Sequence, residues 1–396
     1  MSRRRSILAY YAFRATRSYG FYLPYSVIFL ERQGLGLAAI GIVQAAFLVA
    51  VVGGEIPTGY VADRFGRRAS FGLASVLAAV SLALFPFATG TAAFGLLLGG
   101  MGLALTLETG ASDAWLYELL EANGDDEEYA RFKGRSETVR LVAGAGGAVL
   151  AGPLYALDPT YPFLANAGLA VLGLPVLLLL PTVPGGDGTT VADAVGRLRV
   201  AAGRPSLRWI AVYGALLFGL IQGVRAFEQL AAEQVGVPLV SLGVLYAAFK
   251  LSSAAAASTT GPLVERFGPV GALGLFAPVI VVAYGSVAFA PILVLPVLFA
   301  NRGLMVALSP LQGQYVNDRL PDAGRATVVS SISMVASVGG ALGTVLAGQV
   351  ATVTGPVGLV PVAGVTVGLA VGGLWIATLR PYRRASTDES VGEDAI

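Results

Sequence analysis

Ten ionisable side chains interrupt long apolar stretches of this sequence, and they are the residues best placed to do chemistry. A charge at the centre of a membrane-spanning helix costs about 2.5–3.5 kcal/mol on insertion scales, so each is a functional candidate by default. A desolvated carboxylate with no cation close by could carry a proton, and the slight basic excess would suit an anionic or zwitterionic solute. The ten are Arg14, Arg17, Glu55, Glu108, Asp113, Arg140, Arg225, Glu228, Lys250 and Arg302.

Other reactive side chains are missing from the composition. The sequence contains no cysteine and no histidine. Their absence excludes disulfides, thiolate and imidazole metal ligands, and the Ser-His and Cys-His arrangements of nucleophilic catalysis. The net charge of +2 is too small to indicate a nucleic-acid partner. We therefore expect no enzymatic activity, no metal site and no cofactor.

Membrane-spanning helices must position these charges. Hydrophobic residues make up 55% of the chain and charged residues 13%, and the mean hydropathy is +0.73, which indicates an integral membrane protein. Continuous apolar runs without period-2 alternation favour helices over barrel strands. About twelve spans are predicted, at residues 7–30, 36–61, 69–88, 91–117, 137–157, 161–181, 208–231, 239–261, 269–289, 291–316, 326–352 and 357–379.

The distribution of basic residues predicts the orientation of these spans. With the N-terminus inside, nineteen Lys and Arg residues fall in cytoplasmic segments, and only Arg32 falls in an outer loop. This asymmetry follows the positive-inside rule and places both termini in the cytoplasm of a cell with the chain in its plasma or inner membrane. The start MSRRR resembles a signal peptide, but Arg14 and Arg17 interrupt the apolar run that follows. The first helix is therefore expected to be retained.

An internal repeat divides the chain into two halves. The stretch GYVADRFG at residues 59–66 recurs in part as GPLVERFG at residues 261–268. The prediction is an all-α integral membrane protein of twelve transmembrane helices in two six-helix pseudo-symmetric bundles. The bounds are 1–181 for the first bundle, 182–207 for a cytoplasmic linker with a short amphipathic helix, 208–380 for the second bundle and 381–396 for a cytoplasmic tail. The mixed-charge stretch 118–137 is expected to be a solvated loop.

The charged stretch that follows the second span resembles a known signature. Its residues match, position by position, the pattern Gly-x-x-x-Asp-Arg/Lys-x-Gly-Arg-Arg/Lys of the major facilitator superfamily, and with the six-plus-six layout the resemblance covers essentially the whole chain. The second copy departs from the pattern because Glu265 replaces Asp and Pro269-Val270 replace the paired basic residues. The first copy comprises Gly59, Asp63, Arg64, Gly66, Arg67 and Arg68, and the second keeps Glu265, Arg266 and Gly268.

Each residue of this gating motif has an expected role. Gly59 would permit a close approach of helices, and Gly66 would permit a tight turn. The resemblance implies that Asp63 docks on the start of the eleventh span, near residues 325–327, when the cavity opens outward. The alternative is that the Arg cluster only enforces topology.

The resemblance also implies a central cavity lined by the first, fourth, seventh and tenth spans. Arg17, Glu108, Arg225 and Arg302 fall on these spans. Two roles stay open for Glu108, namely proton or cation coupling and a structural ion pair with Arg17 or Arg140. Two roles also stay open for Glu55, which could face the cavity or be a buried partner for an Arg. The full predicted cavity set is Arg14, Arg17, Glu55, Glu108, Asp113, Arg225, Glu228, Lys250 and Arg302.

Neighbouring charges on one helix suggest local pairs. Arg14 and Arg17 are spaced i and i+3 and share a face of the first span, and Arg225 could pair with Glu228 in the seventh.

The function implied by the resemblance is secondary active transport of a small organic solute by alternating access, coupled to protons, in a monomer embedded in the lipid bilayer. The stretch GAGGAVLAGPLYAL at residues 144–157 partly resembles the Gly-rich motif of the superfamily's antiporters, although its small residues are equally expected for helix packing. Efflux by antiport therefore gains only slight support. A transporter-like sensor or receptor that does not move its ligand is the alternative function.

Overall fold

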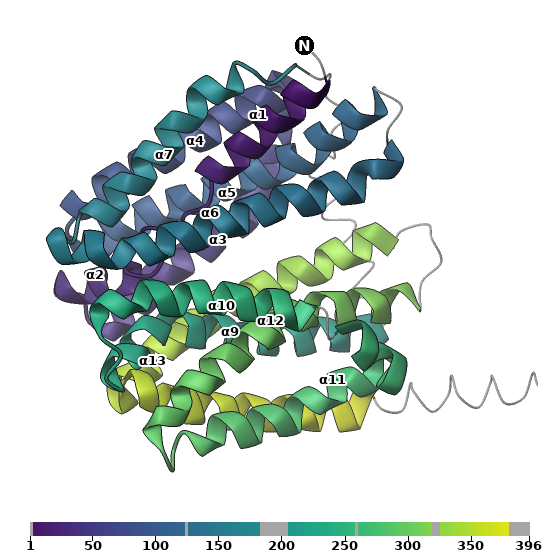
Figure 1. Cartoon of the computed structure of the whole chain (residues 1–396). Helices are drawn as coiled ribbons and strands as arrows, with labels where there is room; N and C mark the ends of the chain where they lie inside the picture. The colour runs from purple at the N-terminus through teal and green to yellow at the C-terminus, as the bar shows by residue number, and fades with distance from the viewer. Residues whose placement is uncertain (1–2, 123–125, 183–204, 258–259, 319–324, 380–396) are drawn as a thin grey trace, which may run out of the picture. The chain divides into compact units, whose positions relative to one another are not determined.

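The computed structural model describes residues 3–122, 126–182, 205–257, 260–318 and 325–379, which are nearly all helical and contain no strand (Figure 1). The all-α fold class predicted from the sequence is confirmed. Most of the predicted linker, with its amphipathic helix, and the predicted tail lie outside the described residues.

The chain divides into two compact units. The first comprises Met1–Thr190 and Val237–Lys250, and the second comprises Val191–Gly236 and Leu251–Ile396. Residues 237–250 group with the first unit because Tyr25 Oη donates a hydrogen bond to the Leu239 carbonyl at 2.7 Å. A Cβ at Gly152 would also lie only 2.1 Å from the Val240 carbonyl oxygen, so the two backbones touch there. The domain bounds predicted from the sequence place residues 237–250 in the second bundle instead, and those bounds stay a prediction.

In the first unit, long helices pack through neighbours that are distant in sequence. The helix α5 packs on α3 and α4, α7 packs on α4, and α1 packs on both α6 and α7. The helices are α1 (Arg3–Thr16), α2 (Ser26–Arg32), α3 (Leu37–Phe65), α4 (Arg67–Leu84), α5 (Gly90–Glu121), α6 (Tyr129–Leu157) and α7 (Tyr161–Leu177).

The first predicted span is broken. Its helix ends at Thr16 and resumes only at Ser26, whereas the apolar run predicted one helix over 7–30. The intervening Tyr19 has a φ of 50°, which is the left-handed region that side chains other than glycine rarely adopt. Non-helical backbone at this depth is tolerated where the rest of the protein satisfies its polar groups, as when the Tyr22 amide donates to Asn166 Oδ1 at 2.9 Å.

In the second unit, α9 packs on α13 and α12, and α11 packs on α12 and α13. Gly355, with a φ of 75°, interrupts α13 between the two spans predicted at 326–352 and 357–379. The helices are α9 (Pro205–Gln234), α11 (Thr260–Ser286), α12 (Val294–Asn317) and α13 (Arg325–Leu374), and α10 (Leu242–Ala257) begins in the first unit.

Nine helices of the described residues are long and apolar enough to cross a membrane, and Tyr161–Leu177 is a shorter apolar helix. The broken first span, the short α7 and the single count given to α13 account for the difference from twelve. The count of twelve stays a prediction.

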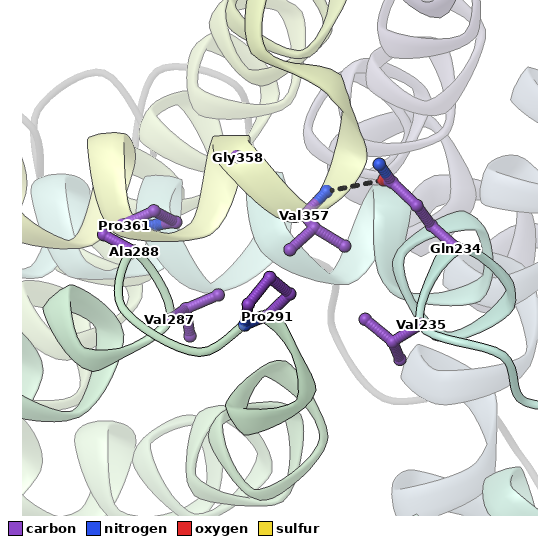
Figure 2. A pocket seen from close by; sticks show the side chains of 8 residues that line it. All are labelled: Gln234, Val235, Val287, Ala288, Pro291, Val357, Gly358 and Pro361. Carbon is purple, nitrogen blue, oxygen red and sulfur yellow. Dashed lines mark hydrogen bonds between the residues drawn. The ribbon is translucent and has the colours of Figure 1, made fainter.

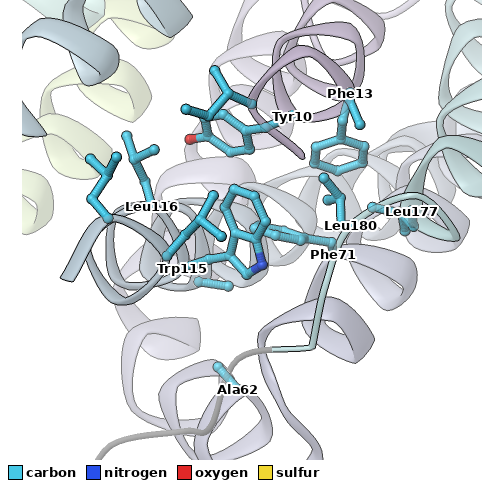
Figure 3. Packing of buried hydrophobic residues seen from close by; sticks show 13 residues of the cluster. Tyr10, Phe13, Ala62, Phe71, Trp115, Leu116, Leu177 and Leu180 are labelled. Carbon is cyan, nitrogen blue, oxygen red and sulfur yellow. The ribbon is translucent and has the colours of Figure 1, made fainter. Parts of the chain in front are cut away.

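A tight apolar core anchors the first unit (Figure 3). The rings of Tyr10 and Trp115 stack with their centroids 5.0 Å apart. The polar edges of these rings are satisfied, because Tyr10 Oη lies 2.6 Å from Ser112 Oγ and Trp115 Nε1 donates to the Pro181 carbonyl at 3.1 Å. This core fixes the C-terminal half of α5 against α1.

The last turns of α5 correct one prediction. The stretch 118–137 was expected to be a solvated loop, but α5 continues to Glu121 and α6 begins at Tyr129. Leu119 and Leu120 extend the apolar face of α5 into the core, and their burial stabilises the extra helical turn.

In the second unit, α9 and α13 meet along a stripe of small residues. A Cβ at Gly343 would lie 2.3 Å from the Gly219 carbonyl oxygen, and one at Gly339 would lie 2.4 Å from that of Ala215. Only glycine allows two helices to approach this closely. The seam therefore joins α9 and α13 backbone to backbone.

Candidate functional site

The first unit holds a network of five charged side chains, three of them buried and two, Glu137 and Arg140, partly exposed. Glu108 on α5 accepts hydrogen bonds from Arg14 Nη1 at 2.6 Å and from Arg17 Nε at 2.7 Å. Arg14 continues the network to Glu137 on α6, which also pairs with Arg140 at 2.8 Å. Arg14, Arg17 and Glu108 are only 5%, 0% and 2% exposed. Both oxygens of Glu108 are thus compensated by guanidinium groups, which is the ion-pair role left open for this residue.

Arg17 keeps two hydrogen-bonding groups unused. Its Nη1 and Nη2 atoms are buried and have no hydrogen-bond partner among the described residues. The guanidinium carbon lies 4.9 Å from the ring centroid of Tyr19, whose own buried hydroxyl also lacks a described partner. These donors lie at the break in the first span.

Lys250 of α10 reaches the same region of the first unit. A Cβ at Gly144 on α6 would lie 2.9 Å from Lys250 Nζ and 3.1 Å from the Ser18 carbonyl oxygen. The ammonium group also lies 5.4 Å from the centroid of the Tyr246 ring. Because Gly144 has no side chain, the ammonium group can approach the residue that follows Arg17.

In the described part of the second unit, Arg302 and Glu228 form a buried ion pair. Arg302 Nη2 on α12 donates to Glu228 Oε1 on α9 at 2.5 Å, and the two residues are 7% and 4% exposed. The other oxygen, Oε2, is buried and has no described partner. Arg225 does not form the predicted ion pair with Glu228 and instead lies 3.4 Å from Gln222 Oε1. The predicted pairing of Arg225 with Glu228 is therefore wrong, and the role of these residues in a cavity stays a prediction.

Two residues of the predicted cavity set lie outside these clusters. Glu55 is exposed near the middle of α3, and no Arg is described as its partner. Asp113 is also exposed and pairs with Lys133 at 2.6 Å. It lies on α5, C-terminal to the buried Glu108. Asp113 stands two residues before the core residue Trp115, about half a turn of helix, so the two side chains point to nearly opposite faces of α5.

One member of the network was missed. Glu137 stands at the predicted start of the fifth span, three residues before Arg140, and was not singled out. The i and i+3 spacing of opposite charges was the available signal.

The first copy of the gating motif is tied to its own unit. Arg67 donates from Nη1 to Asp63 at 2.7 Å and from Nη2 to Glu118 of α5 at 3.3 Å. Arg68 reaches the Leu180 carbonyl at 3.4 Å, and Arg64 is exposed. The motif therefore links the ends of α3, α4 and α5.

The two glycines of this copy behave differently. Gly66 has a φ of 89°, which supports the tight turn between α3 and α4 that was predicted for it. The prediction for Gly59 was wrong, because a Cβ built there would meet no described atom within 4 Å. No helix approaches Gly59 closely enough to require a glycine.

The second copy keeps the turn and loses the ties. Gly268 has a φ of 65° and divides α11 at a kink. Glu265 and Arg266 are exposed, and the Arg266 guanidinium lies 5.5 Å from the centroid of the neighbouring Phe267 ring. The departure of Pro269 and Val270 from the signature removes the basic partners that hold the first copy.

A cavity of about 420 Å³ lies within the second unit (Figure 2). Gln234 Oε1 accepts a hydrogen bond from the Val357 amide at 3.1 Å and closes one side of it. None of the residues that the sequence predicted for the site lines this cavity. The lining residues are Gln234, Val235, Val287, Ala288, Pro291, Val357, Gly358 and Pro361.

Among the described residues, no group of three or more Asp and Glu side chains could hold a metal ion. The buried carboxylates Glu108 and Glu228 instead meet guanidinium groups.

Comparison with known proteins identifies the class of protein that this fold defines. The model of the Major Facilitator Superfamily matches residues 7–344, and the chain belongs to this superfamily. It is a multi-pass membrane transporter of a small molecule, not an enzyme. An uncharacterized MFS-type transporter of Bacillus subtilis (strain 168), YxaM, is 25% identical over 157 residues, which cover 39% of this chain and only 38% of that protein.

Solved structures share the fold over nearly the whole chain. The nucleoside transporter NupG has a TM-score of 0.81 at 13% identity, with 96% of this chain and 99% of that chain covered. A bacterial homologue of the human lysosomal transporter Spinster has a TM-score of 0.73 at 14% identity, with 97% and 96% covered. The D-xylose-proton symporter has a TM-score of 0.65 at 15% identity, with 93% and 96% covered. At these identities the likeness concerns the fold alone.

Proposed function

We propose that this protein is a secondary active transporter that moves a small organic solute by alternating access, coupled to protons, in the plasma or inner membrane with both termini in the cytoplasm. The single observation that carries the proposal is that each unit buries charged side chains of its own in an apolar helical interior. Such charges are costly in a membrane and mark solute or ion pathways. Superfamily membership, the positive-inside distribution of Lys and Arg, and the proton-coupled sugar symporter with a similar fold support it further.

The proton is assigned to Glu228 in preference to Glu108. Glu108 is compensated by two guanidinium groups, one on each oxygen, so loss of its charge would leave Arg17 without its carboxylate partner and Arg14 with Glu137 alone. Glu228 meets one guanidinium, that of Arg302, and leaves Oε2 without a described partner. Desolvation disfavours the charged form of a carboxylate, and one cation offsets this less than two do.

The charged groups around Glu228 are few. Arg302 faces it from α12, and Arg225 precedes it by one turn on α9. The helix α13 also packs on α9, and between residues 326 and 374 its sequence contains no ionisable side chain. Protonation of Glu228 would weaken its tie to Arg302, and this provides a physical link between proton uptake and movement of α12 relative to α9.

Antiport is not favoured by the Gly-rich stretch of α6. Gly152 lies against the Val240 carbonyl and Gly147 against the Phe21 ring, so their small size serves packing within the first unit. Flux measurements in both directions test the direction of transport. A determination of the protein's mass in detergent tests whether it is a monomer.

Proton-coupled flux in liposomes tests the proposal. Purified full-length protein is first screened for thermal stabilisation by nucleosides, sugars, amino acids and carboxylates, and the solutes that stabilise it are then added to proteoliposomes containing a pH-sensitive dye. We expect solute-dependent proton movement in the wild type. In Glu228→Gln, proton movement should be lost, whereas exchange of labelled solute across the membrane without a proton gradient should continue.

The exposed Glu265 provides a matched control in the same unit, because Glu265→Gln makes the same chemical change away from the buried pair. Proton movement that persists in Glu228→Gln would remove this residue from the mechanism. A ligand that stabilises the protein but never crosses the membrane would identify a transporter-like sensor instead.

A further inference from the structure

The buried network of the first unit has more positive than negative charges. Arg14, Arg17 and Arg140 contribute three guanidinium groups to it. Only the carboxylates Glu108 and Glu137 face them in the network. Charges inside a membrane protein are normally paired. The excess therefore calls for a negative group that the chain itself does not supply within the network.

Arg17 supplies the donors that such a group would need. Of its guanidinium nitrogens only Nε bonds to Glu108, and Nη1 and Nη2 have no described partner although the residue is fully buried. Arg14 differs, because both of its Nη atoms are occupied by carboxylates. A planar guanidinium with two free nitrogens fits the two oxygens of a carboxylate or phosphate group. The free edge of Arg17 is therefore an unfilled anion-binding edge.

The break in the first span lies directly at this edge. The helix ends at Thr16 directly before Arg17, and the strained Tyr19, with its unpartnered hydroxyl, follows within the break. Interrupted helices in transporters line their solute and ion sites, since the backbone there is free of helical hydrogen bonds. Strain of this kind persists where surrounding structure or function requires it.

We propose that the first unit binds the anionic group of the transported solute, a carboxylate or a phosphate ester, at the Nη1 and Nη2 atoms of Arg17 beside Tyr19. This rests on the proposed transport function and narrows its substrate class to organic anions or zwitterions. Glu108 is then a positioning residue, which holds Arg17 through Nε and leaves the other edge open.

The test compares organic anions with their neutral counterparts on purified full-length protein. The solutes are acetate, lactate, succinate, benzoate and glycerol 3-phosphate, each beside its amide or, for the phosphate, glycerol, with sodium chloride at equal ionic strength. We expect at least one organic anion to raise the thermal unfolding midpoint while its neutral counterpart and chloride do not. Arg17→Lys, which keeps the charge but loses the paired donors, should weaken this binding about tenfold or more.

Two further variants keep the test decisive. Arg131→Lys makes the same change at an exposed site of the same unit and should bind the anion like the wild type. If Arg17→Lys does not fold, the double variant Arg17→Gln with Glu108→Gln removes one charge of each sign, and it should lose the preference for the anion over its neutral counterpart.

The outcomes separate this inference from the proposed function. Equal binding of neutral counterparts, undiminished binding in Arg17→Lys, or stabilisation by chloride alone or by none of the solutes would overturn the anion site. Transport of a neutral solute at the wild-type rate in Arg17→Lys would overturn it and leave the transporter proposal intact. If the anion binds only when Arg17 is present but the protein moves no solute, the anion site stands and the transporter proposal is overturned.

Discussion

The two units bury carboxylates of the same type in different surroundings. Glu108 in the first unit is held by two guanidinium groups, and Glu228 in the second is held by one. Both residues are nearly fully buried, at 2% and 4% exposed, so exposure does not distinguish them. The comparison teaches that the number of cationic partners separates a carboxylate that maintains structure from one suited to exchange a proton.

The copies of the charged motif differ in the same sense. In the first unit, Asp63, Arg67 and Glu118 form a chain of ion pairs that joins three helices. In the second unit, Glu265 and Arg266 are exposed. The first unit is thus held by two charge networks, one around Glu108 and one around Arg67. The second unit relies on close helix packing between α9 and α13.

The largest expected effect is the loss of the Glu108 charge. Glu108→Gln leaves two buried guanidinium groups, those of Arg14 and Arg17, without their shared partner, and breaking a buried pair in this way costs about 3–5 kcal/mol. Glu228→Gln strands one guanidinium and should lower the unfolding midpoint less. Thermal unfolding in one detergent checks the order of the two variants, with the exposed Glu265→Gln as control. Equal shifts would remove the distinction between network and pair.

Removal of a cation should act in the opposite order. Arg302→Gln leaves Glu228 without its ion-pair partner and should cost about 3 kcal/mol. Arg17→Gln should cost only about 1–2 kcal/mol, because Arg14 still donates to Glu108. Unfolding by a denaturing detergent in mixed micelles measures both free energies. A cost for Arg17→Gln that exceeds that of Arg302→Gln would contradict a shared network in the first unit.

Backbone turns should be alike in the two units. Gly66→Ala and Gly268→Ala each place a Cβ on a residue with positive φ, 89° and 65°, and each should cost about 1–2 kcal/mol. Gly59→Ala is the matched control in the same motif and should change the free energy of unfolding little, because nothing described lies within 4 Å. A large loss of stability in Gly59→Ala, or a small one in Gly66→Ala, would indicate that side-chain contacts decide the cost of these substitutions and that backbone conformation does not.

The smallest effect on stability is expected for Asp63→Asn. Its ion pair with Arg67 is partly exposed, so the loss should be about 0.5 kcal/mol. The transport rate at matched expression should nevertheless fall roughly tenfold, which corresponds to about 1.4 kcal/mol in a barrier. Glu265→Gln in the second copy should leave the rate unchanged. Wild-type transport by Asp63→Asn would exclude a gating role for this carboxylate.

Much of the architecture could be read from the sequence because lipid imposes strict rules on helices. The apolar runs, the repeat of residues 59–66 at 261–268 and the signature predicted the fold class and the family. The break at residues 17–25 could not be read in this way, because Gly20 and Pro24 disfavour a helix there but are also tolerated in membrane-spanning helices, and the run around them is long and aromatic. Breaks of this kind are decided by tertiary partners such as Asn166.

The candidate residues were predicted better than their pairings. Eight of the buried or half-buried charges were chosen because of their depth within apolar runs, and that criterion depends only on composition. Pairing depends on the rotation of each helix, which a single sequence does not fix. Arg302 therefore meets Glu228 in place of Arg225, and Asp113 points away from the network to Lys133.

The glycines with positive φ have a further consequence. Gly34 and Gly236, with φ of 83° and 93°, stand 202 residues apart, and so do Gly66 and Gly268. Two bends of the chain have thus been inherited at the same spacing while the ionic partners beside them have diverged. Duplication of a half-length segment would produce this equal spacing, and the main chain turns at matching places in the two halves although the side chains beside the turns differ.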